Sequence, residues 1–472
     1  MIGEIHEECG IFGIYDNDGL DAARTTYYAL YALQHRGQES CGIAVNDNRT
    51  VVFHKGVGLV PDVFNEVILN HLKGQMAIGH CRYSTTGNST IENAQPLVSK
   101  YIKGTLALAH NGNLINSQQL RRELELNGAI FQTTNDSEVI AYILAKERLR
   151  SSSIEEAVQR SMGVLKGAYS IVLMSPEKLI AARDPYGFRP LSIGKIKNSY
   201  VIASETCAFD AIGAEFVRDI DPGEIVVIGK QGISSIRTNC TGRPNLCIFE
   251  FVYFARPDSV LEGASVYLAR QEAGRYLAKE HPVEADVVIG VPDSGLDAAL
   301  GYSKESGIPY GVGFIKNRYV GRTFIQSTQD QRDIAVKIKL NVLKAAVEGK
   351  RVILVDDSIV RGTTSKRIVS DLRAAGATEV HMRISSPPFL NPCYFGTDID
   401  SKDKLIACKM SIEEIAKELG ADSLGYLSID NLRKIPVGAN CDFCDGCFTG
   451  KYPMDVSWVD DYSKDMLEKS KE

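Results

Sequence analysis

The stretch that decides the fold of the second half of the chain is residues 351–364, which read RVILVDDSIVRGTT. Residues 352–355 are apolar and mostly β-branched, which is typical of a strand buried on both faces of a sheet. The strand leads directly into two adjacent carboxylates, Asp356 and Asp357, and residues 361–364 then open a helix with small and hydroxyl-bearing side chains. Free N–H groups and the dipole at a helix N-terminus favour a phosphate, and open α/β sheets bind ligands beyond their strand ends. The stretch therefore predicts an anion site whose carboxylates suit a hydroxylated ligand or its Mg²⁺.

The whole string resembles the signature of the type I phosphoribosyltransferases, which bind 5-phosphoribosyl-1-pyrophosphate (PRPP). This resemblance implies that Asp356 and Asp357 hold the ribose hydroxyls and a Mg²⁺ ion. It implies that the 5-phosphate is cradled by Arg361, Gly362, Thr363 and Thr364. A bare pair of aspartates could instead form an acidic turn at the end of a Rossmann-type strand, but the length of the matching string disfavours that interpretation.

Periodicity divides the chain into two halves. Residues 285–384 alternate between apolar runs and amphipathic segments, which predicts a doubly wound parallel α/β sheet. There we expect strands at 287–291, 310–314, 352–355 and 379–384, and helices from 296, at 334–348 and at 364–375. In residues 9–203 the strands and helices are partly segregated, which favours α+β layers. There we expect strands at 9–14, 42–45, 51–54, 76–82, 106–110, 168–174 and 179–182, and helices at 20–34, 117–126, 137–149 and 154–164.

The composition is that of a globular protein and argues against several functions. A chain of 472 residues is too long for one ordinary domain, so two or three domains are expected. A net charge of −6 without a basic run argues against nucleic-acid binding, and no apolar stretch approaches membrane-spanning length. Residues 1–8 contain three glutamates and no apolar core, so they are not a secretory signal, and we expect a cytoplasmic enzyme.

Five separated strings in the first half carry a second chemistry. They are CGIFG from residue 9, QHRGQESCGI from residue 34, GHCRYSTTG from residue 79, HNGNL from residue 110 and TNDSE from residue 134. In this order they resemble the glutamine amidotransferase domain of the N-terminal-nucleophile class, over residues 9 to about 210. The resemblance implies an αββα glutaminase fold.

Cys9 is the nucleophile that this resemblance implies. A thiol with an ordinary pKa of about 8.5 is mostly protonated at neutral pH and needs a base. The α-amine of a chain-terminal cysteine, with a pKa of about 8, can serve once the preceding residues are removed, so residues 1–8 are expected to be a propeptide. A cysteine paired with His35, His80 or His110 is an alternative that the spacing does not exclude.

Four further residues are implied to bind glutamine or stabilise the reaction. Arg82 offers a two-donor fork for the α-carboxylate, and Asp136 would pair with the α-amino group. Asn111 and the backbone N–H of Gly112 suit an oxyanion hole, because two donors can be aimed at the developing charge.

Together the halves resemble the family of glutamine PRPP amidotransferases over nearly the whole chain. The implied reaction converts glutamine, PRPP and water into 5-phosphoribosylamine, pyrophosphate and glutamate, the first committed step of purine synthesis. We expect a propeptide at 1–8, a glutaminase domain at 9–240 and a phosphoribosyltransferase domain at 241–472. The resemblance also implies a Mg²⁺ contact at Ser294, and a loop at 316–326 whose Lys316, Arg318 and Arg322 close over pyrophosphate. Purine nucleotide inhibitors and a homotetramer are implied as well.

The cysteines predict a metal centre. The chain has eleven, and the run Cys441, Cys444, Cys447 indicates metal ligation rather than disulfides in a reducing compartment. A lone C-x-x-C pair would favour zinc. The contexts of four cysteines resemble the iron–sulfur branch of the family, which implies a [4Fe–4S] cluster on Cys247, Cys393, Cys444 and Cys447, unless Cys441 replaces one of the last pair. The isolated cysteines are expected to be small buried hydrophobes; they are Cys41, Cys81, Cys207, Cys240 and Cys408.

A PRPP-sensing repressor with the same fold is the main alternative from another class of protein. It predicts a DNA-binding module and a basic face, and the sequence contains neither. It also leaves Cys9 unexplained.

Overall fold

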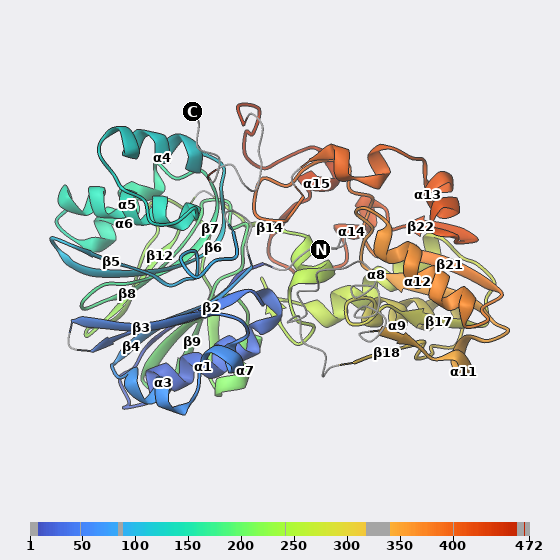
Figure 1. Cartoon of the computed structure of the whole chain (residues 1–472), viewed down its shortest axis with the longest axis horizontal. Helices are drawn as coiled ribbons and strands as arrows, with labels where there is room; N and C mark the ends of the chain where they lie inside the picture. The colour runs from blue at the N-terminus through green and yellow to red at the C-terminus, as the bar shows by residue number, and fades with distance from the viewer. Residues whose placement is uncertain are drawn as a thin grey trace.

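A computed structural model describes residues 8–47, 49–83, 88–240, 242–317, 340–399, 401–459 and 467. Within these residues the chain forms two lobes that lie side by side (Figure 1). The first lobe holds two stacked sheets, and the second holds a smaller sheet between helices.

The first lobe is a sandwich of two antiparallel sheets. Among the described residues, the sheets run β11-β9-β10-β1-β4-β2-β3 and β13-β12-β8-β7-β6-β5. The strands of the first sheet are β1 (Gly10–Tyr15), β2 (Ser40–Asp47), β3 (Thr50–Val57), β4 (Met76–Arg82), β9 (Ser192–Ile196), β10 (Ser199–Ala203) and β11 (Glu215–Asp219). Those of the second are β5 (Leu97–Tyr101), β6 (Gly104–Leu114), β7 (Gly167–Met174), β8 (Leu179–Arg183), β12 (Ile225–Gly229) and β13 (Gly232–Ile236).

Helices cover both outer faces of this sandwich (Figure 1). The seven-stranded sheet is covered by α1 (Ala22–Ala32), α2 (Val60–Val63), α3 (Glu66–His71) and α7 (Cys207–Ile212), and the other by α4 (Ser117–Leu126), α5 (Asp136–Leu149) and α6 (Ile154–Met162). In β1, Ile11 and Tyr15 point into the core between the sheets while Phe12 and Ile14 pack under α1. The expected αββα layering is confirmed.

The second lobe is built on a parallel sheet in the order β17-β20-β21-β22. These strands are β17 (Val287–Gly290), β20 (Arg351–Asp356), β21 (Glu379–Ile384) and β22 (Ser423–Tyr426). One face packs against α8 (Val266–Glu280) and α9 (Gly295–Ser306), and the other against α12 (Thr363–Ala374) and α13 (Ile412–Leu419). Alternate residues of β20 enter the two cores, Ile353 on one face and Leu354 on the other, so the doubly wound α/β prediction is confirmed.

Short elements connect and flank these layers. They are η1 (Gln34–Arg36), β14 (Asn245–Cys247), the π-helical turn η2 (Glu250–Phe254), β15 (Val260–Leu261), β16 (Ala264–Ser265), β18 (Phe314–Lys316), β19 (Leu340–Val342), α11 (Lys344–Val347), η3 (Lys402–Lys404), η4 (Ile406–Cys408), α14 (Ile429–Leu432), β23 (Asp442–Cys444) and α15 (Gly446–Thr449). The parallel pair β14–β23 ties the C-terminal segment to the junction between the lobes.

Two sequence predictions in the second lobe are wrong. The strand expected at 310–314 forms only an isolated bridge between Tyr310 and Val288, and the strand begins instead at β18. The helix expected at 334–348 is contradicted by β19, which pairs with β18, and α11 is only four residues long. A tertiary strand partner overrides the local helical periodicity at β19. Residues 334–339 lie outside the described part of the chain.

The isolated cysteines follow expectation only in part. Cys41, Cys81 and Cys207 are buried, whereas Cys240 is half-buried and Cys408 is exposed. A small thiol on the surface loses little by being in water, so burial of a lone cysteine depends on its location in the fold.

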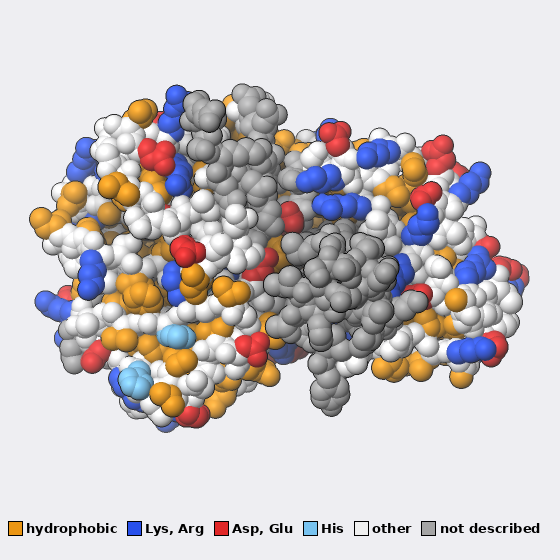
Figure 2. All heavy atoms as spheres, in the orientation of Figure 1, with side chains coloured by type: hydrophobic (Ala, Val, Ile, Leu, Met, Phe, Trp, Pro, Cys, Tyr) orange, Lys and Arg blue, Asp and Glu red, His pale blue; other side chains and the backbone are white. Residues whose placement is uncertain are grey.

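The surface carries mixed charge. On the face shown in Figure 2, Lys and Arg side chains lie among Asp and Glu side chains over both lobes and do not gather into one basic face. Among the described helices, none combines the length and apolar character needed to cross a membrane.

Candidate active sites and metal centre

The first candidate site is a cavity at the start of β1. It is lined by Cys9, Arg82, Tyr83, Gln95, His110, Gly112, Asn135, Asp136 and Ser137. Four residues predicted from separated motifs thus meet here: Cys9, Arg82, Gly112 and Asp136. Gln95 and Ser137 were not predicted; Ser137 lies within the TNDSE string, but nothing in the sequence signals Gln95.

The Cys9 thiol is buried and protonated. It donates to the carbonyl oxygen of Tyr83 at 3.2 Å, and burial raises the pKa of Cys9 to about 12. Glu8 precedes it through an intact peptide bond, and its buried carboxylate pairs with Arg189 at 2.6 Å. Burial raises the pKa of Glu8 to about 7. A thiol in this environment requires a base before it can act as a nucleophile.

The histidines considered as that base do not bond the thiol among the described contacts. His35 Nε2 lies 2.8 Å from a carboxylate oxygen of Glu205, and His80 Nε2 lies 3.0 Å from the carbonyl oxygen of His110. Burial lowers the pKa of His80 to about 3. His110 lines the cavity and bonds Ser137 through Nδ1 at 2.9 Å.

The oxyanion candidates lie on β6. Asn111 is buried, and both atoms of its carboxamide lack a partner among the described residues, although it is not a lining residue of the cavity. Gly112 has φ of +142°, and a Cβ built there would lie 2.2 Å from the carbonyl oxygen of Ala168. Only glycine suits this backbone, which leaves the Gly112 segment of the cavity wall without a side chain.

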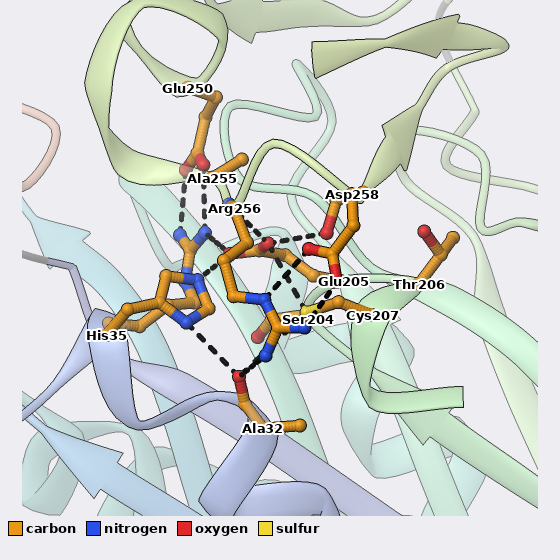
Figure 3. Close-up of polar contacts among 12 residues, drawn as sticks. Ala32, His35, Ser204, Glu205, Thr206, Cys207, Glu250, Ala255, Arg256 and Asp258 are labelled. Carbon is orange, nitrogen blue, oxygen red and sulfur yellow. Dashed lines mark hydrogen bonds and ion pairs between the residues drawn. The ribbon is translucent and has the colours of Figure 1, made fainter. Parts of the chain in front are cut away.

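A buried charge cluster adjoins Cys9, and Figure 3 shows its acidic members Glu205 and Glu250 together with His35. Arg36 Nε donates to the carbonyl oxygen of Cys9 at 3.0 Å, and its Nη1 donates to Glu205 at 2.6 Å. Glu250, from the segment that follows the first lobe, accepts from both terminal nitrogens of Arg36 at 2.8 and 2.9 Å. Fully buried charges are stable only when paired in this way.

The same region brings together three possible metal ligands, His35, Glu205 and Cys207. The carboxylate of Glu205 already accepts from His35, Arg36, the backbone N–H of Arg256 and the Ser259 hydroxyl. A cation would have to compete with Arg36 for this carboxylate, so the donor set fits an ion-pair cluster rather than a metal site.

The second candidate site lies where β17 and β20 end. These strands are parallel neighbours, so the residues that follow them meet at one edge of the sheet. The Ser294 hydroxyl donates to the buried carboxylate of Asp357, and Asp356 Oδ1 accepts from the backbone N–H of Asp357 at 2.9 Å. The predicted Mg²⁺ residues are therefore adjacent in space.

The predicted phosphate loop opens α12. Gly362 has φ of +80° and forms the N-cap, which favours glycine. Arg361 and Thr363 are exposed and Thr364 is half-buried. Lys316 forms an ion pair with Asp293 at the same edge, whereas Arg318 and Arg322 lie outside the described residues.

The third candidate site is a group of four cysteines. Cys247 and Cys444 are register partners in the β14–β23 pair, and the carbonyl of Cys447 accepts from the backbone of Leu390 and Asn391, which leads to Cys393. Burial raises the pKa of Cys447, and the neighbouring thiols Cys393, Cys247 and Cys444 raise it further. Burial raises the pKa of Cys441 to about 12, and its main charged neighbours are Glu262, Arg183 and Asp442 rather than other cysteines, so its surroundings differ from those of the other four.

The distances between these four thiols show whether they could bind a single zinc ion. Among the described residues, no three of them have sulfurs within 4.8 Å of one another. Four thiolates on one zinc ion at about 2.3 Å would lie about 3.8 Å apart. The four thiols are spread too widely for a single zinc ion.

Comparison with known proteins agrees with the two-lobed fold. A glutamine amidotransferase domain family matches residues 80–211, and a phosphoribosyl transferase domain family matches residues 267–385. A chain that joins these domains is a glutamine-dependent glycosyltransferase.

Relatives over the whole length define the family. The chain is 52% identical to the amidophosphoribosyltransferase of Methanocaldococcus jannaschii, covering 95% of this chain and 98% of the relative. It is 49% identical to that of Bacillus subtilis, covering 97% of each. The chain belongs to the amidophosphoribosyltransferase family and carries out glutamine-dependent amidotransfer to PRPP in purine synthesis.

Two solved structures share the whole fold. One is the Bacillus subtilis glutamine PRPP amidotransferase in complex with ADP and GMP, with a TM-score of 0.88, 49% identity, and coverage of 95% of this chain and 98% of that one. The other is described as the allosteric regulatory enzyme of purine biosynthesis, with a TM-score of 0.90, 48% identity, and coverage of 98% and 99%.

Proposed function

We propose that Cys9 hydrolyses glutamine after residues 1–8 are removed, and that the released ammonia reacts at the second site. The observation that carries this proposal is the convergence of Cys9, Arg82, Gly112 and Asp136 on one cavity. Removing residues 1–8 frees an α-amine on the nucleophile itself, which supplies the base that the described histidines do not.

The chemistry follows from these positions. The α-amine takes the thiol proton as Sγ attacks the carboxamide carbon, and the former carbonyl oxygen is held by the Gly112 N–H and Asn111. Collapse of this adduct breaks the C–N bond, the proton passes to the leaving nitrogen, and ammonia departs. Water then hydrolyses the thioester to glutamate and the free thiol. Arg82 and Asp136 hold the amino-acid end of the substrate.

In the second lobe we assign PRPP binding to the sheet edge. Asp356, Asp357 and Ser294 would hold Mg²⁺. When bound, this ion would neutralise the negative charge of the departing pyrophosphate. The carboxylates also suit the ribose hydroxyls, and Lys316 suits the pyrophosphate. The 5-phosphate is assigned to Arg361, Gly362, Thr363 and Thr364, at a helix N-terminus that favours anions.

The four cysteines Cys247, Cys393, Cys444 and Cys447 are proposed to hold a [4Fe–4S] cluster. Their wide spacing supports a group larger than one zinc ion. When bound, such a cluster would link the C-terminal segment to the junction of the lobes, with no part in the transfer reaction.

The regulation and assembly of this chain are inferred from its relatives. The complex of the Bacillus subtilis enzyme with ADP and GMP supports purine nucleotides as inhibitors of this chain. A homotetramer and a cytoplasmic location remain predictions.

The test of the proposed function compares two nitrogen sources. Cys9→Ala should abolish synthesis of phosphoribosylamine from glutamine and keep synthesis from ammonia, and active wild-type protein should begin at Cys9 by intact mass. Cys41→Ala, which removes another buried thiol of the same lobe, should retain both activities. Loss of both activities in folded Cys9→Ala, or active protein that starts at Ile2, would contradict the proposal.

A further inference from the structure

A closed hydrogen-bond network forms part of the wall of the Cys9 cavity, the proposed glutamine site. Gln95 Oε1 accepts from the backbone N–H of His110 at 2.8 Å, and Gln95 Nε2 donates to Ser137 Oγ at 3.1 Å. Ser137 Oγ also lies 2.9 Å from His110 Nδ1. All three side chains are at least 98% buried, so these bonds are shielded from water.

The network joins the two elements that carry the substrate-binding groups. His110 precedes Asn111 and Gly112 on β6, and Ser137 follows Asp136 in the first turn of α5. A second bond links the same elements, because Asp136 Oδ2 accepts from the backbone N–H of Leu114 at 2.9 Å. Two sets of hydrogen bonds therefore fix the distance between the oxyanion candidates, Asn111 and Gly112, and the Asp136 carboxylate that is proposed to bind the α-amino group.

His110 contributes a further polar atom to this site. Its Nδ1 lies 2.9 Å from Ser137 Oγ and 3.6 Å from Asp136 Oδ1. Its Nε2 is buried without a partner among the described residues, and the ring lines the cavity. An unpaired buried polar atom is destabilising, so Nε2 is suited to a bound ligand.

We propose that Gln95, Ser137 and His110 form a positioning network that selects glutamine by its length. It fixes the distance between the site for the α-amino group at Asp136 and the oxyanion donors at Asn111 and Gly112. It also holds the His110 ring, whose unpartnered Nε2 is available to the substrate. Asparagine, shorter by one methylene, cannot reach both ends of a rigid site. The inference rests on the proposed roles of Cys9 and Asp136 and adds the residues that set their spacing.

The test uses Ser137→Ala, which removes the hydroxyl and its bonds with Gln95, His110 and Asp136. We expect the KM for glutamine to rise about tenfold, since each lost hydrogen bond contributes a factor of several, while kcat changes by about twofold or less. The preference for glutamine over asparagine in kcat/KM should fall, and ammonia-dependent activity should be unchanged. Ser137→Thr, which keeps the hydroxyl, should restore the KM, and Gln95→Met should behave like Ser137→Ala.

A chemical readout separates positioning from a loss of folding. In the processed protein, Ser137→Ala should slow alkylation of Cys9 by a diazoketone analogue of glutamine, which must bind by its amino-acid end. Alkylation of Cys9 by iodoacetamide, which needs no such binding, should be unchanged. Ser161→Ala removes another buried hydroxyl in the same lobe, bonded to Ala157 in α6, and should change neither rate.

The inference would be overturned if Ser137→Ala slowed alkylation of Cys9 by both reagents equally. It would also be overturned if this variant left both the KM for glutamine and the preference for glutamine over asparagine unchanged. That outcome would leave the assignment of Cys9 intact, because the two nitrogen sources test Cys9 separately.

Discussion

Glu250 forms a two-point ion pair with Arg36, with oxygen-to-nitrogen distances of 2.8 and 2.9 Å. Arg36 holds the carbonyl of Cys9, whereas Glu250 belongs to the segment that leads into the second lobe. Both side chains are fully buried. The backbone of Cys9, the proposed nucleophile, is therefore held by an arginine whose counter-ion comes from beyond the first lobe.

Glu250→Ala should destabilise the protein by about 3–5 kcal/mol, because it leaves Arg36 buried beside a single carboxylate. Urea unfolding followed by circular dichroism measures the loss. Glu66→Ala removes the partner of Arg24 in an exposed two-point pair and is the matched control, with no measurable shift of the midpoint expected. A loss as small as that of the control would show that the buried pair contributes little.

The effect of Glu205 on stability should depend on pH. Burial alone would raise the pKa of Glu205, but the charges of His35 and Arg36 hold it well below its ordinary value of 4.5. A depressed carboxyl pKa contributes its full stabilisation above pH 4.5 and loses it as the pH falls below that value. The difference in unfolding free energy between wild type and Glu205→Gln should therefore shrink by about 1.4 kcal/mol per pH unit on acidification. A difference that stays constant below pH 4.5 would refute the assignment.

Asp357→Ala should reduce activity about a hundredfold or more with both glutamine and ammonia, because it acts on PRPP after ammonia release. The assay is pyrophosphate formation with each nitrogen source. Asp403→Ala, an exposed aspartate of the same lobe in η3, should leave both rates unchanged. If Asp357→Ala reduced only the glutamine-dependent rate, the carboxylate would not belong to the PRPP site.

Protein purified without oxygen should be brown and contain about four irons per chain. Cys444→Ser should lose the iron, whereas Cys441→Ser should keep it, since the main neighbours that shift the pKa of Cys441 are charged side chains and not the other cysteines. Iron content and the visible spectrum check both variants. Colourless, fully active protein with one zinc per chain would exclude the cluster.

Local patterns predicted most elements of the first lobe. The strand Met76–Arg82 and the helix Ser117–Leu126 begin and end at the predicted residues. Periodicity failed at Leu340–Val342, where a helical pattern was overridden by pairing with Phe314–Lys316. Helix α8 and strands β9 to β13 were not predicted, although β12 reads IVVIG, an apolar run typical of a buried strand.

The sequence by itself determined the two catalytic chemistries, because Cys9, Arg82, Asp136 and the acid pair Asp356–Asp357 stand in contiguous motifs whose residue types imply their roles. Only the tertiary structure decided which further groups meet them. The contact of Gln95 with Ser137 spans 42 positions, and that of Arg36 with Glu250 spans 214. Such contacts depend on the path of the chain through the sheets and on the burial that makes a paired charge or hydroxyl stable, and neither is encoded in local spacing.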